Sequence, residues 1–293
     1  MTDLDLLAER FDAQRSHLRA VAYRMLGSLS ESDDAVQEAW LRASRADAGQ
    51  VENLGGWFTT IVARVCLNIL RGRTVRPEQP YGIHMPDPVV SRAEAVDPEH
   101  QAVLADSVGL ALLVVLDMLT PAERLSFVLH DMFAVPFDEI AAIVPCTPAA
   151  ARQLASRARR RVQQAPTPDR DPVRQREVVD AFFAASRNGD FDALVSVLHP
   201  DVVLRSDGGA ARAVASVFFR GAQEVAGNAV MYGALAPHAR PVLVNGAPGV
   251  IVVPRNEAVS IMAFTVSDGL IVAIDVLADP DRLRALDVAS SAD

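Results

Sequence analysis

The chain has 293 residues, half of them hydrophobic, and a net charge of −9 at pH 7. This length accommodates two or three domains with apolar cores, and the acidic balance excludes a general polyanion-binding protein, so any nucleic-acid contact requires local basic patches. Cys66 and Cys146 form no disulfide framework or metal-ligand spacing, and without a signal peptide or a bilayer-spanning apolar run we expect a cytoplasmic protein with no membrane contact.

The first part of the chain, residues 4–45, has helical periodicity with a break from Gly27 to Ser30. We expect the second helix to begin at Ser32 or Asp33 and to bury its alanines and Val36. Its opposite face carries polar side chains at Asp34, Gln37, Glu38 and Arg42. On spacing alone, this face is an ordinary solvent-exposed surface.

Residues 53–76 combine aromatic and basic side chains. We expect a turn over residues 53–56 and a helix that opens at Trp57 and Phe58. Arginines lie on or just past this helix, and no acidic residue occurs between Trp57 and Pro77. Aromatic rings that stack on bases, beside guanidinium groups that hold the backbone, suit a strand with unstacked bases. A buried tryptophan in a helical core with a basic end fits the same pattern equally well.

A proline-containing segment follows. Residues 77–98 hold five prolines and little periodicity, which predicts an ordered or semi-rigid linker. A helix is expected over residues 97–119. After it, Thr120, Pro121 and Glu123 fit a capping box that opens another amphipathic helix.

The stretch from residue 137 to residue 162 has the pattern of a helix-turn-helix. Its first helix is followed by a break at Pro145 and Cys146, and then Thr147 and Pro148 suit the cap and first position of a second helix. That second helix has one apolar stripe, many arginines and no acidic residue up to Arg161. Such a helix can enter a major groove. An arginine-rich solvated face on a helical bundle is the alternative, and the acidic chain around it favours DNA binding.

The remainder of the chain, after a second linker at residues 165–172, changes to α+β. We expect a helix that ends at Asn188 and Gly189 with a left-handed cap, and a shorter helix over residues 191–201. A run of antiparallel strands follows, with a turn at Asp268 and Gly269 before the last one. Helices followed by strands predict a curved sheet wrapped on helices, a cone with room for an interior pocket.

Two stretches of the helical part resemble two regions of one known family, in the same order along the chain. LTPAERLSFVLHDMFAVPFDEIAAIVPCTPAAARQLASRARRRV resembles region 4 of the extracytoplasmic-function (ECF) sigma factors of the sigma-70 family, and DDAVQEAWLRASR with GGWFTTIVARVCLNILRGR resembles their region 2. The resemblance implies an alternative sigma factor that binds core RNA polymerase, at the β′ clamp and the β flap, and directs it to promoter DNA. It implies two all-α sigma domains, region 2 at residues 1–76 and region 4 at 108–165, joined by a linker at 77–107.

The same resemblance assigns residues to partners. The face that binds core polymerase is Asp34, Gln37, Glu38 and Arg42. The part that melts and reads the −10 element contains Trp57, Arg64, Asn68, Arg71 and Arg73. In the −35 reader, bases and backbone are assigned to Arg152, Gln153, Ser156 and Arg157, and phosphates to Arg159 and Arg160.

Residues 172–287 resemble the SnoaL-like, NTF2-like extension of the sigma-J type branch of this family. The branch has DGGG, NPDKL and WLPEP motifs. In this chain the first reads DGGA from Asp207 and lacks the third glycine, and the second reads ADPDRL from Ala278 and lacks the asparagine. The third, in the linker, reads HMPDP from His84 and lacks the aromatic residue. The resemblance implies that the cone regulates the factor in cis in place of a separate anti-sigma protein. The regulatory residues would form two contacts. One is a glycine loop that allows close approach of a neighbour, with Asp207, Gly208 and Gly209. The other contains Asp279, Pro280, Asp281 and Leu283.

Two other functions of the cone stay open. SnoaL-like cones include ketosteroid-isomerase-like and polyketide-cyclase-like enzymes, whose carboxylate or histidine abstracts a proton beside a carbonyl. The candidates are Asp207, His199, His238 and Asp275, and their spacing forms no recognisable acid–base set. We therefore expect no enzyme activity, no catalytic residue, no cofactor and no metal. A small-molecule sensor with an apolar pocket is the third alternative.

Overall fold

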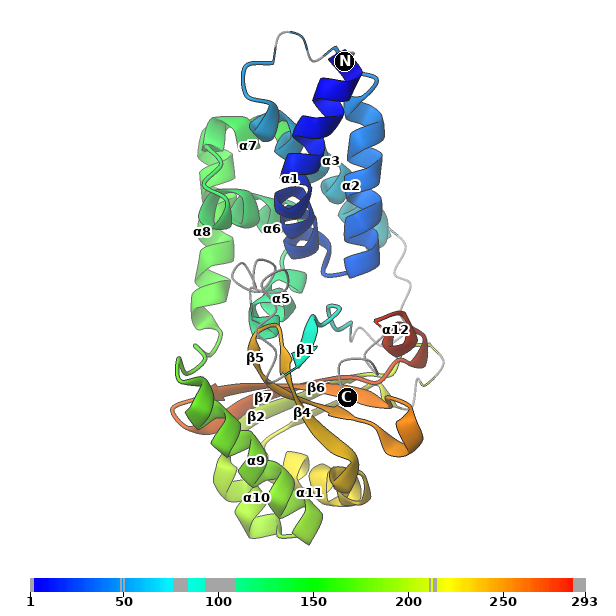
Figure 1. Ribbon diagram of the computed structural model, residues 1–293. Coiled ribbons are helices and arrows are strands. Elements are labelled where there is room, and N and C mark those ends of the chain that lie inside the picture. The colour runs from blue at the N-terminus through cyan, green and yellow to red at the C-terminus, as the bar shows by residue number, and fades with distance from the viewer. Residues whose placement is uncertain are drawn as a thin grey trace. The chain divides into compact units, whose positions relative to one another are not determined.

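The computed structural model describes residues 3–47, 49, 51–75, 84–92, 109–210, 212 and 215–286, and its elements are drawn in Figure 1. The chain divides into two compact units. The helical unit comprises Met1–Glu78 and Leu112–Ala165, and the sheet unit comprises Gln79–Ala111 and Pro166–Asp293. The sheet unit thus takes in part of the segment that the sequence analysis treats as a linker.

Three helices form the first part of the helical unit. They are α1 (Asp3–Leu26), α2 (Leu29–Ala43) and α3 (Leu54–Val75). They pack around fully buried side chains that include Phe11, Leu18 and Phe58. Burial of such side chains stabilises the bundle by roughly 1.5–3 kcal/mol each.

Two predicted boundaries in this part are wrong. The second helix begins at Leu29 rather than at Ser32 or Asp33, because Ser28 takes the cap position and accepts a hydrogen bond from the backbone of Glu31. The third helix begins at Leu54, because the Asn53 side chain accepts from the backbone of Gly56 at 3.0 Å and starts the helix where a turn was expected.

The second part of the helical unit contains the predicted helix-turn-helix. Its elements are α5 (Leu110–Asp117), α6 (Pro121–Phe127), the π-helical η1 (Val128–Met132), α7 (Phe137–Ile143) and α8 (Pro148–Gln164). The capping box at Thr120 and Glu123 is confirmed, with both reciprocal hydrogen bonds present. Thr147 caps α8 as predicted. The predicted helix over residues 97–119 falls outside the described residues up to residue 108.

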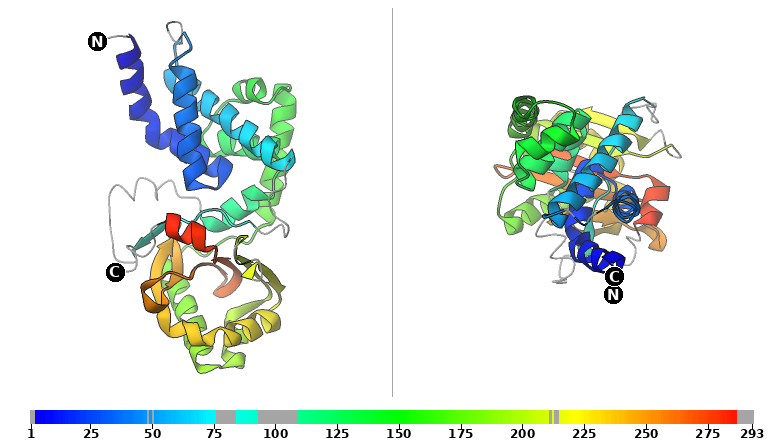
Figure 2. Two further views of the ribbon diagram at one scale, coloured as in Figure 1. Left: turned by 90° about the vertical axis from the view of Figure 1, so that its right-hand side faces the viewer. Right: turned by 90° about the horizontal axis from the view of Figure 1, so that it is seen from above.

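The two parts of the helical unit pack against each other. Helix α3 contacts α6 and α7, and α1 contacts η1. Figure 2 shows the same arrangement from two further sides, with α1 to α3 in blue beside α6 to α8 in green.

The sheet unit is built on one seven-stranded sheet of order β1-β4-β5-β6-β7-β2-β3. The strands are β1 (Val90–Arg92), β2 (Leu198–Asp207), β3 (Val217–Arg220), β4 (Ala239–Val244), β5 (Ala247–Val252), β6 (Ser260–Ser267) and β7 (Leu270–Leu277). The predicted run of antiparallel strands is present from β4 to β7, and the parallel pairing of β2 with β7 was not predicted. Strand β2 also begins at Leu198, so residues 199–201 are strand rather than the end of a helix.

Helices cover one face of this sheet (Figure 1). They are α9 (Pro172–Asn188), α10 (Phe191–Val197) and α11 (Ala222–Met231), and the 3-10 turns η3 (Gly233–His238) and η4 (Pro254–Asn256) and the short α12 (Pro280–Ala285) complete the unit. Gly189 ends α9 with φ +65°, which confirms the predicted left-handed cap. The described part of the chain thus confirms helical domains followed by an α+β cone.

Strand β1 is the feature that the sequence analysis did not predict. It pairs antiparallel with β4, with Val90 opposite Val244 and Arg92 opposite Val242. A segment from the middle of the chain therefore forms an edge of the sheet whose other strands all follow residue 197.

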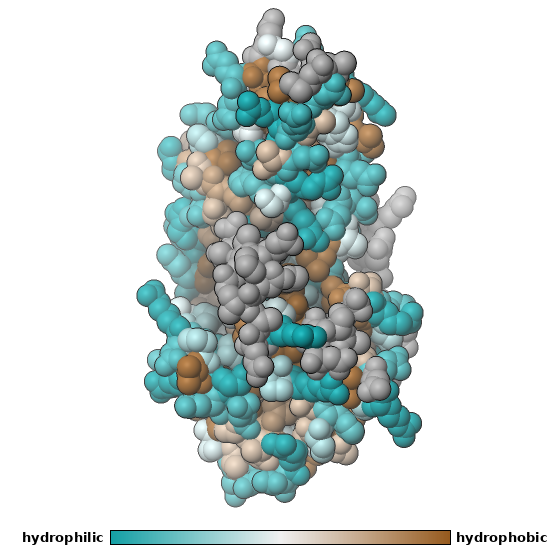
Figure 3. Space-filling view, viewed as in Figure 1, coloured by the Kyte–Doolittle hydropathy of each residue, from teal (hydrophilic) through white to brown (hydrophobic). Residues whose placement is uncertain are grey.

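The surface is mixed in character. On the face drawn in Figure 3, hydrophilic side chains (teal) surround small separate groups of hydrophobic ones (brown). Among the described residues, no helix is both long enough and apolar enough to cross a bilayer.

Candidate functional site

Helix α8 has one buried face and one face of long polar side chains. Ala151, Ala155 and Ala158 are fully buried, which holds the helix on α6 and α7. On the opposite side Arg152, Gln153 and Arg160 are exposed and Ser156 is half-buried. These buried alanines belong to the apolar stripe that was predicted for this helix, and the long polar side chains lie on its other face.

Three arginines of α8 have carboxylate partners. Arg157 and Arg161 lie 3.0 Å and 3.5 Å from the buried Glu123, and Arg159 lies 2.6 Å from Asp131. Burial opposes ionisation of Glu123, but hydrogen bonds from Thr120 and Arg157 outweigh it and hold the pKa of this carboxyl below its ordinary value. Two of the six residues predicted for the −35 element, Arg157 and Arg159, are therefore engaged within the fold.

Among the described residues, the other four residues predicted for the −35 element have no carboxylate partner. Arg152 lies over the ring of Phe137, 5.4 Å from its centroid, which orients the guanidinium beside the start of α8. Among the described residues, Arg160 has no ion pair. Arg152, Gln153 and Arg160 therefore present a free polar face.

Helix α3 carries a second row of exposed polar side chains. Arg64, Asn68 and Arg71 are exposed and follow one another at helical spacing. Trp57 is half-buried and packs on Phe58, with 5.4 Å between ring centroids. Arg73 instead pairs with Glu31 and donates to the carbonyl of Leu26 at 3.1 Å. The structure thus separates Arg73 from the other predicted −10 residues, because it holds α3 to α2.

Contacts join α1 and α3 to the second part of the helical unit. Phe133 lies 5.1 Å from the ring of His17 and 4.8 Å from the guanidinium of Arg24. The buried Arg124 donates to the backbone carbonyl of Arg24 and pairs with Asp117 at 2.8 Å. On the surface, Arg64 of the exposed α3 row donates to the carbonyl of Ala142 in α7 at 3.3 Å.

Helix α2 presents the polar face that was predicted. Asp34, Gln37 and Arg42 are exposed, and Arg42 pairs with the half-buried Glu38 at 2.9 Å, one helical turn away. Such an exposed pair stabilises the helix by only about 0.3–0.5 kcal/mol. Leu41 on the same side is 41% exposed, which gives this face an apolar centre.

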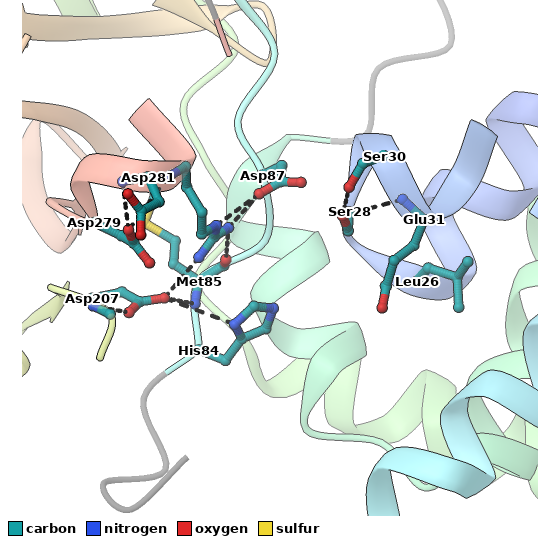
Figure 4. A network of polar contacts seen from close by, with 12 residues as sticks. Leu26, Ser28, Ser30, Glu31, His84, Met85, Asp87, Asp207, Asp279 and Asp281 are labelled. Atoms are coloured by element: carbon teal, nitrogen blue, oxygen red, sulfur yellow. Dashed lines mark hydrogen bonds and ion pairs between the residues drawn. The ribbon is translucent and has the colours of Figure 1, made fainter. Parts of the chain in front are cut away.

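In the sheet unit, the central observation is a buried carboxylate. Asp207 is 1% exposed, and its Oδ2 accepts hydrogen bonds from the backbone N–H of Met85 at 3.0 Å and from Arg282 Nη1 at 2.8 Å. Its Oδ1 accepts from the backbone of Gly209. Figure 4 shows Asp207 pointing toward Met85 and His84, which come from the segment before β1.

Arg282 completes this arrangement. Its Nε lies 2.9 Å from Asp87, and its Nη2 donates to the carbonyl of Met85. We name the side chains of Asp87, Asp207 and Arg282 the latch. Asp281 and Leu283, on either side of Arg282, were predicted from the sequence, whereas Arg282 and Asp87 were not, although both lie inside the ADPDRL and HMPDP motifs. The opposite charges of Arg282 and Asp87 were the feature of the sequence that could have indicated this pair.

The two glycines after Asp207 allow close approach of the chain. Gly209 has φ +63°, and a Cβ at this position would overlap the carboxyl group of Asp279. A Cβ at Gly208 would overlap the carbonyl of Arg212. Asp279 in turn caps α12 by accepting from the backbone of Asp281 and Arg282. This loop therefore positions the helix that carries Arg282.

The remaining predicted regulatory residues lie around α12. Pro280 is its first residue, and Leu283 is 3% exposed and anchors it to the sheet unit. Asp281 is exposed and pairs with Arg284 at 2.6 Å.

The other end of the segment is held by its backbone. We call residues 84–92 the docked segment. Asn245, at φ 49° in the turn between β4 and β5, donates from its backbone to Val89 O at 2.8 Å and accepts from Val89 N at 3.0 Å. Residues 85–89 are all buried.

Three of the four candidate catalytic residues have separate partners, and the fourth, His238, is exposed. Asp275 is 2% exposed and pairs with Arg205 at 2.7 Å; burial raises the pKa of its carboxyl and the arginine opposes that rise. His199 accepts from the backbone of Asp201, His238 is exposed, and Asp207 belongs to the latch. Within the described residues, no hydrogen bond or ion pair joins two of the four.

Large side chains pack the sheet face that the helices cover. Phe182 and Phe264 lie in its buried cluster with 5.7 Å between ring centroids, and Phe183 packs against both. Asp275 and Ile274 are neighbours on β7, so Asp275 points to the opposite face from the Ile274 side chain in this cluster.

Comparisons with known proteins agree over nearly the whole chain. The Sigma-70 region 2 model matches residues 11–76, and the Sigma-70 region 4 model matches residues 109–162. The chain is 40% identical over 287 residues to the ECF RNA polymerase sigma factor SigJ of Mycobacterium tuberculosis, covering 93% of this chain and 91% of that protein. It is 34% identical over 294 residues to the probable ECF RNA polymerase sigma factor SigI of the same organism, covering 98% of each.

A solved structure is similar as well. The crystal structure of M. tuberculosis SigJ matches with a TM-score of 0.74 and 38% identity, over 94% of this chain and 98% of that one. The likeness therefore takes in the sheet unit as well as the helical unit.

Proposed function

Because the chain belongs to the extracytoplasmic-function sigma factors of the sigma-70 family, which direct RNA polymerase to promoters, we propose that its cone regulates this activity in cis. The cone does so by holding the docked segment, which lies between region 2 and region 4. The observation that supports the proposal is the latch. In it, Arg282 of the cone binds the Asp87 side chain, and Asp207 accepts hydrogen bonds from Arg282 and from the Met85 backbone.

The DNA contacts follow from the two exposed rows. Arg152 and Gln153, near the start of α8, lie where a recognition helix reads base edges, and Arg160 lies farther along for phosphate. Arg64, Asn68 and Arg71 on α3, beside Trp57, suit a strand with unstacked bases. Arg157 and Arg159 join the −35 contacts only if phosphate displaces their carboxylate partners.

The packing of region 2 on region 4 supports an inhibitory regulation. The −10 and −35 elements lie about 25 base pairs apart, roughly 85 Å along B-form DNA at about 3.4 Å per base pair. Helix α3 contacts α6 and α7 directly, and Arg64 of the −10 surface donates to Ala142 of the helix-turn-helix. This arrangement cannot engage both elements at once, so the regions must separate when the promoter is bound. A tethered docked segment restrains that separation.

The polymerase contact is assigned to α2. Its face of Asp34, Gln37, Glu38 and Arg42 surrounds the exposed Leu41, a polar rim around an apolar centre that is typical of protein interfaces. The β′ clamp is the proposed partner of this face, and the β flap that of region 4. The protein would act in the cytoplasm, where its polymerase is.

We assign no catalytic role to the cone. Asp275 is paired with Arg205, Asp207 belongs to the latch, and the rings of Phe182, Phe183 and Phe264 pack against one another on the helix-covered face. This is why regulation is preferred to proton abstraction or to a ligand sensor.

Run-off transcription with core RNA polymerase tests the proposal. The full-length chain is compared with Arg282→Ala. Arg284→Ala on the same helix is the matched control because, within the part of the chain that the structure describes, Arg284 pairs with the exposed Asp281 and not with the docked segment. We expect Arg282→Ala to raise the yield several-fold and Arg284→Ala to leave it unchanged. An unchanged or lower yield from Arg282→Ala would overturn the inhibitory proposal.

A further inference from the structure

The docked segment is bound in the way that sheet proteins bind separate peptides. It is extended, it adds a strand to an open sheet edge, and most of its contacts are made by its backbone. The cone contributes an edge strand, a buried carboxylate, an arginine and an asparagine, all from residues after residue 197.

The contacts define what the site recognises. Asp207 and Arg282 bind the backbone N–H and carbonyl at the position of Met85, and Arg282 requires a carboxylate two residues later at Asp87. Asn245 binds both backbone groups at the position of Val89. The carboxylate and the other buried side chains of the segment, those of Met85, Pro86, Pro88 and Val89, select for sequence.

The composition of the segment reduces the entropy that binding costs. Pro86 and Pro88 flank Asp87 and fix an extended backbone before Val89 and Val90, which favour a strand. An extended peptide with this order of groups would reach the site with little conformational loss.

We propose that the cone is a peptide receptor, with a site formed by the β4 edge, Asn245, Asp207 and Arg282, that its own docked segment occupies in cis. The partner is an extended protein segment with an apolar residue, a carboxylate two positions later and then a β-branched strand. Such a segment, binding in trans, displaces residues 84–92. Its regulatory consequence rests on the proposed function, whereas the binding itself does not.

Tethering sets how strongly the cis segment competes. The docked segment and the cone belong to one chain, so the segment competes at an effective concentration that dilution of the protein does not lower. A trans peptide of equal intrinsic affinity therefore binds the wild-type chain weakly, because the competent state is only a small fraction of molecules. Weakening the cis segment alone should strengthen trans binding.

The test is a fluorescence-anisotropy titration of a labelled peptide with the sequence of residues 84–92 against the full-length chain. We expect Asp87→Ala in the chain, which weakens the cis ligand and leaves the receptor intact, to tighten peptide binding by about 10–100-fold over wild type. Adding Arg282→Ala to that variant should remove the gain, and adding Arg284→Ala should preserve it. A peptide that itself carries Asp87→Ala should bind the Asp87→Ala chain at least tenfold more weakly.

Two results would overturn the inference. One is that the peptide binds the Asp87→Ala chain no better than wild type, while circular dichroism shows that both chains are fully folded at the assay temperature. The other is that the double variant with Arg282→Ala binds as well as the single variant. Polymerase is absent from this assay, so peptide binding with unresponsive transcription would contradict the proposed function alone.

Discussion

Arg282 and Asp207 are 75 residues apart in the chain, and their side chains meet at 2.8 Å beside the backbone of Met85. Asp207 is 1% exposed, and its carboxylate contacts this arginine, two backbone N–H groups and, at 3.8 Å, the ring of His84. The pair therefore fixes the segment between the two DNA-binding regions to the cone.

A double-mutant cycle measures how far the latch acts as a unit. Asp87→Ala, Arg282→Ala and the double variant are compared by calorimetric unfolding of the sheet unit. Because Asp87 and Arg282 share two hydrogen bonds, their effects should couple by about 0.5–3 kcal/mol, and the double variant should be little worse than Arg282→Ala alone. Purely additive effects would show that Asp87 is held by something other than Arg282.

The glycine loop gives a second prediction. Gly209→Ala combines a strained φ with overlap on Asp279, so we expect it to destabilise the sheet unit by more than about 1 kcal/mol and to raise transcription as Arg282→Ala does. Gly227→Ala is the control, because this glycine lies in α11 with open space around it and alanine favours a helix. Thermal unfolding and run-off transcription of both variants decide the matter. Equal behaviour of the two would contradict the close-approach loop.

The recognition helix predicts two different kinds of loss. Arg152→Ala should cost about 1–3 kcal/mol of discrimination between the correct −35 sequence and a variant sequence. Arg160→Ala should weaken binding about equally on both sequences and reduce the dependence of affinity on salt. Holoenzyme affinity for the two promoters at several salt concentrations separates these outcomes. Loss of discrimination from Arg160→Ala would reverse the assignment.

The lowered pKa of Glu123 gives a pH prediction for the helical unit. A carboxyl whose pKa is lower in the folded state contributes stability above its ordinary pKa of 4.5, and this contribution is lost as the pH falls through the folded value. The unit should therefore lose stability in acid, and Glu123→Gln should flatten that dependence. Both tryptophans, Trp40 and Trp57, lie in the helical unit, so their fluorescence reports its unfolding. An unchanged acid dependence in the variant would remove Glu123 as the cause.

These sites also show what a sequence can and cannot predict. Local signals sufficed for the cap at Thr147, the capping box at Thr120 and the left-handed end at Gly189, because each depends on neighbours within one turn. They misplaced the start of α2, since Ser28 and Ser32 are both capable caps and tertiary packing selects between them.

Contacts between residues that are distant in the chain could not be predicted from the sequence. Strand β1 has three residues and joins β4 across about half of the chain, and Arg282 meets Asp87 across 195 residues. Neither contact leaves a periodic pattern. The family motifs indicated that HMPDP and ADPDRL matter, but only the structure brings the arginine of one to the aspartate of the other.

The pairing of Arg157 and Arg159 with Glu123 and Asp131 illustrates the same limit for function. The sequence shows arginines at helical spacing, and which of them are free depends on carboxylates contributed by α6 and η1. The assignment of these two residues to the −35 element therefore stays a prediction.

The most direct test of the account is amide hydrogen exchange of the docked segment in the free chain and in the initiating complex of polymerase and promoter. In the free chain, the N–H groups of Met85 and Val89 donate to Asp207 and Asn245 and should exchange slowly. If release of the segment accompanies activity, the same amides should lose their protection in the promoter complex by tenfold or more. Protection that stays unchanged in an actively initiating complex would show that the latch remains closed during initiation, and would contradict regulation by its release.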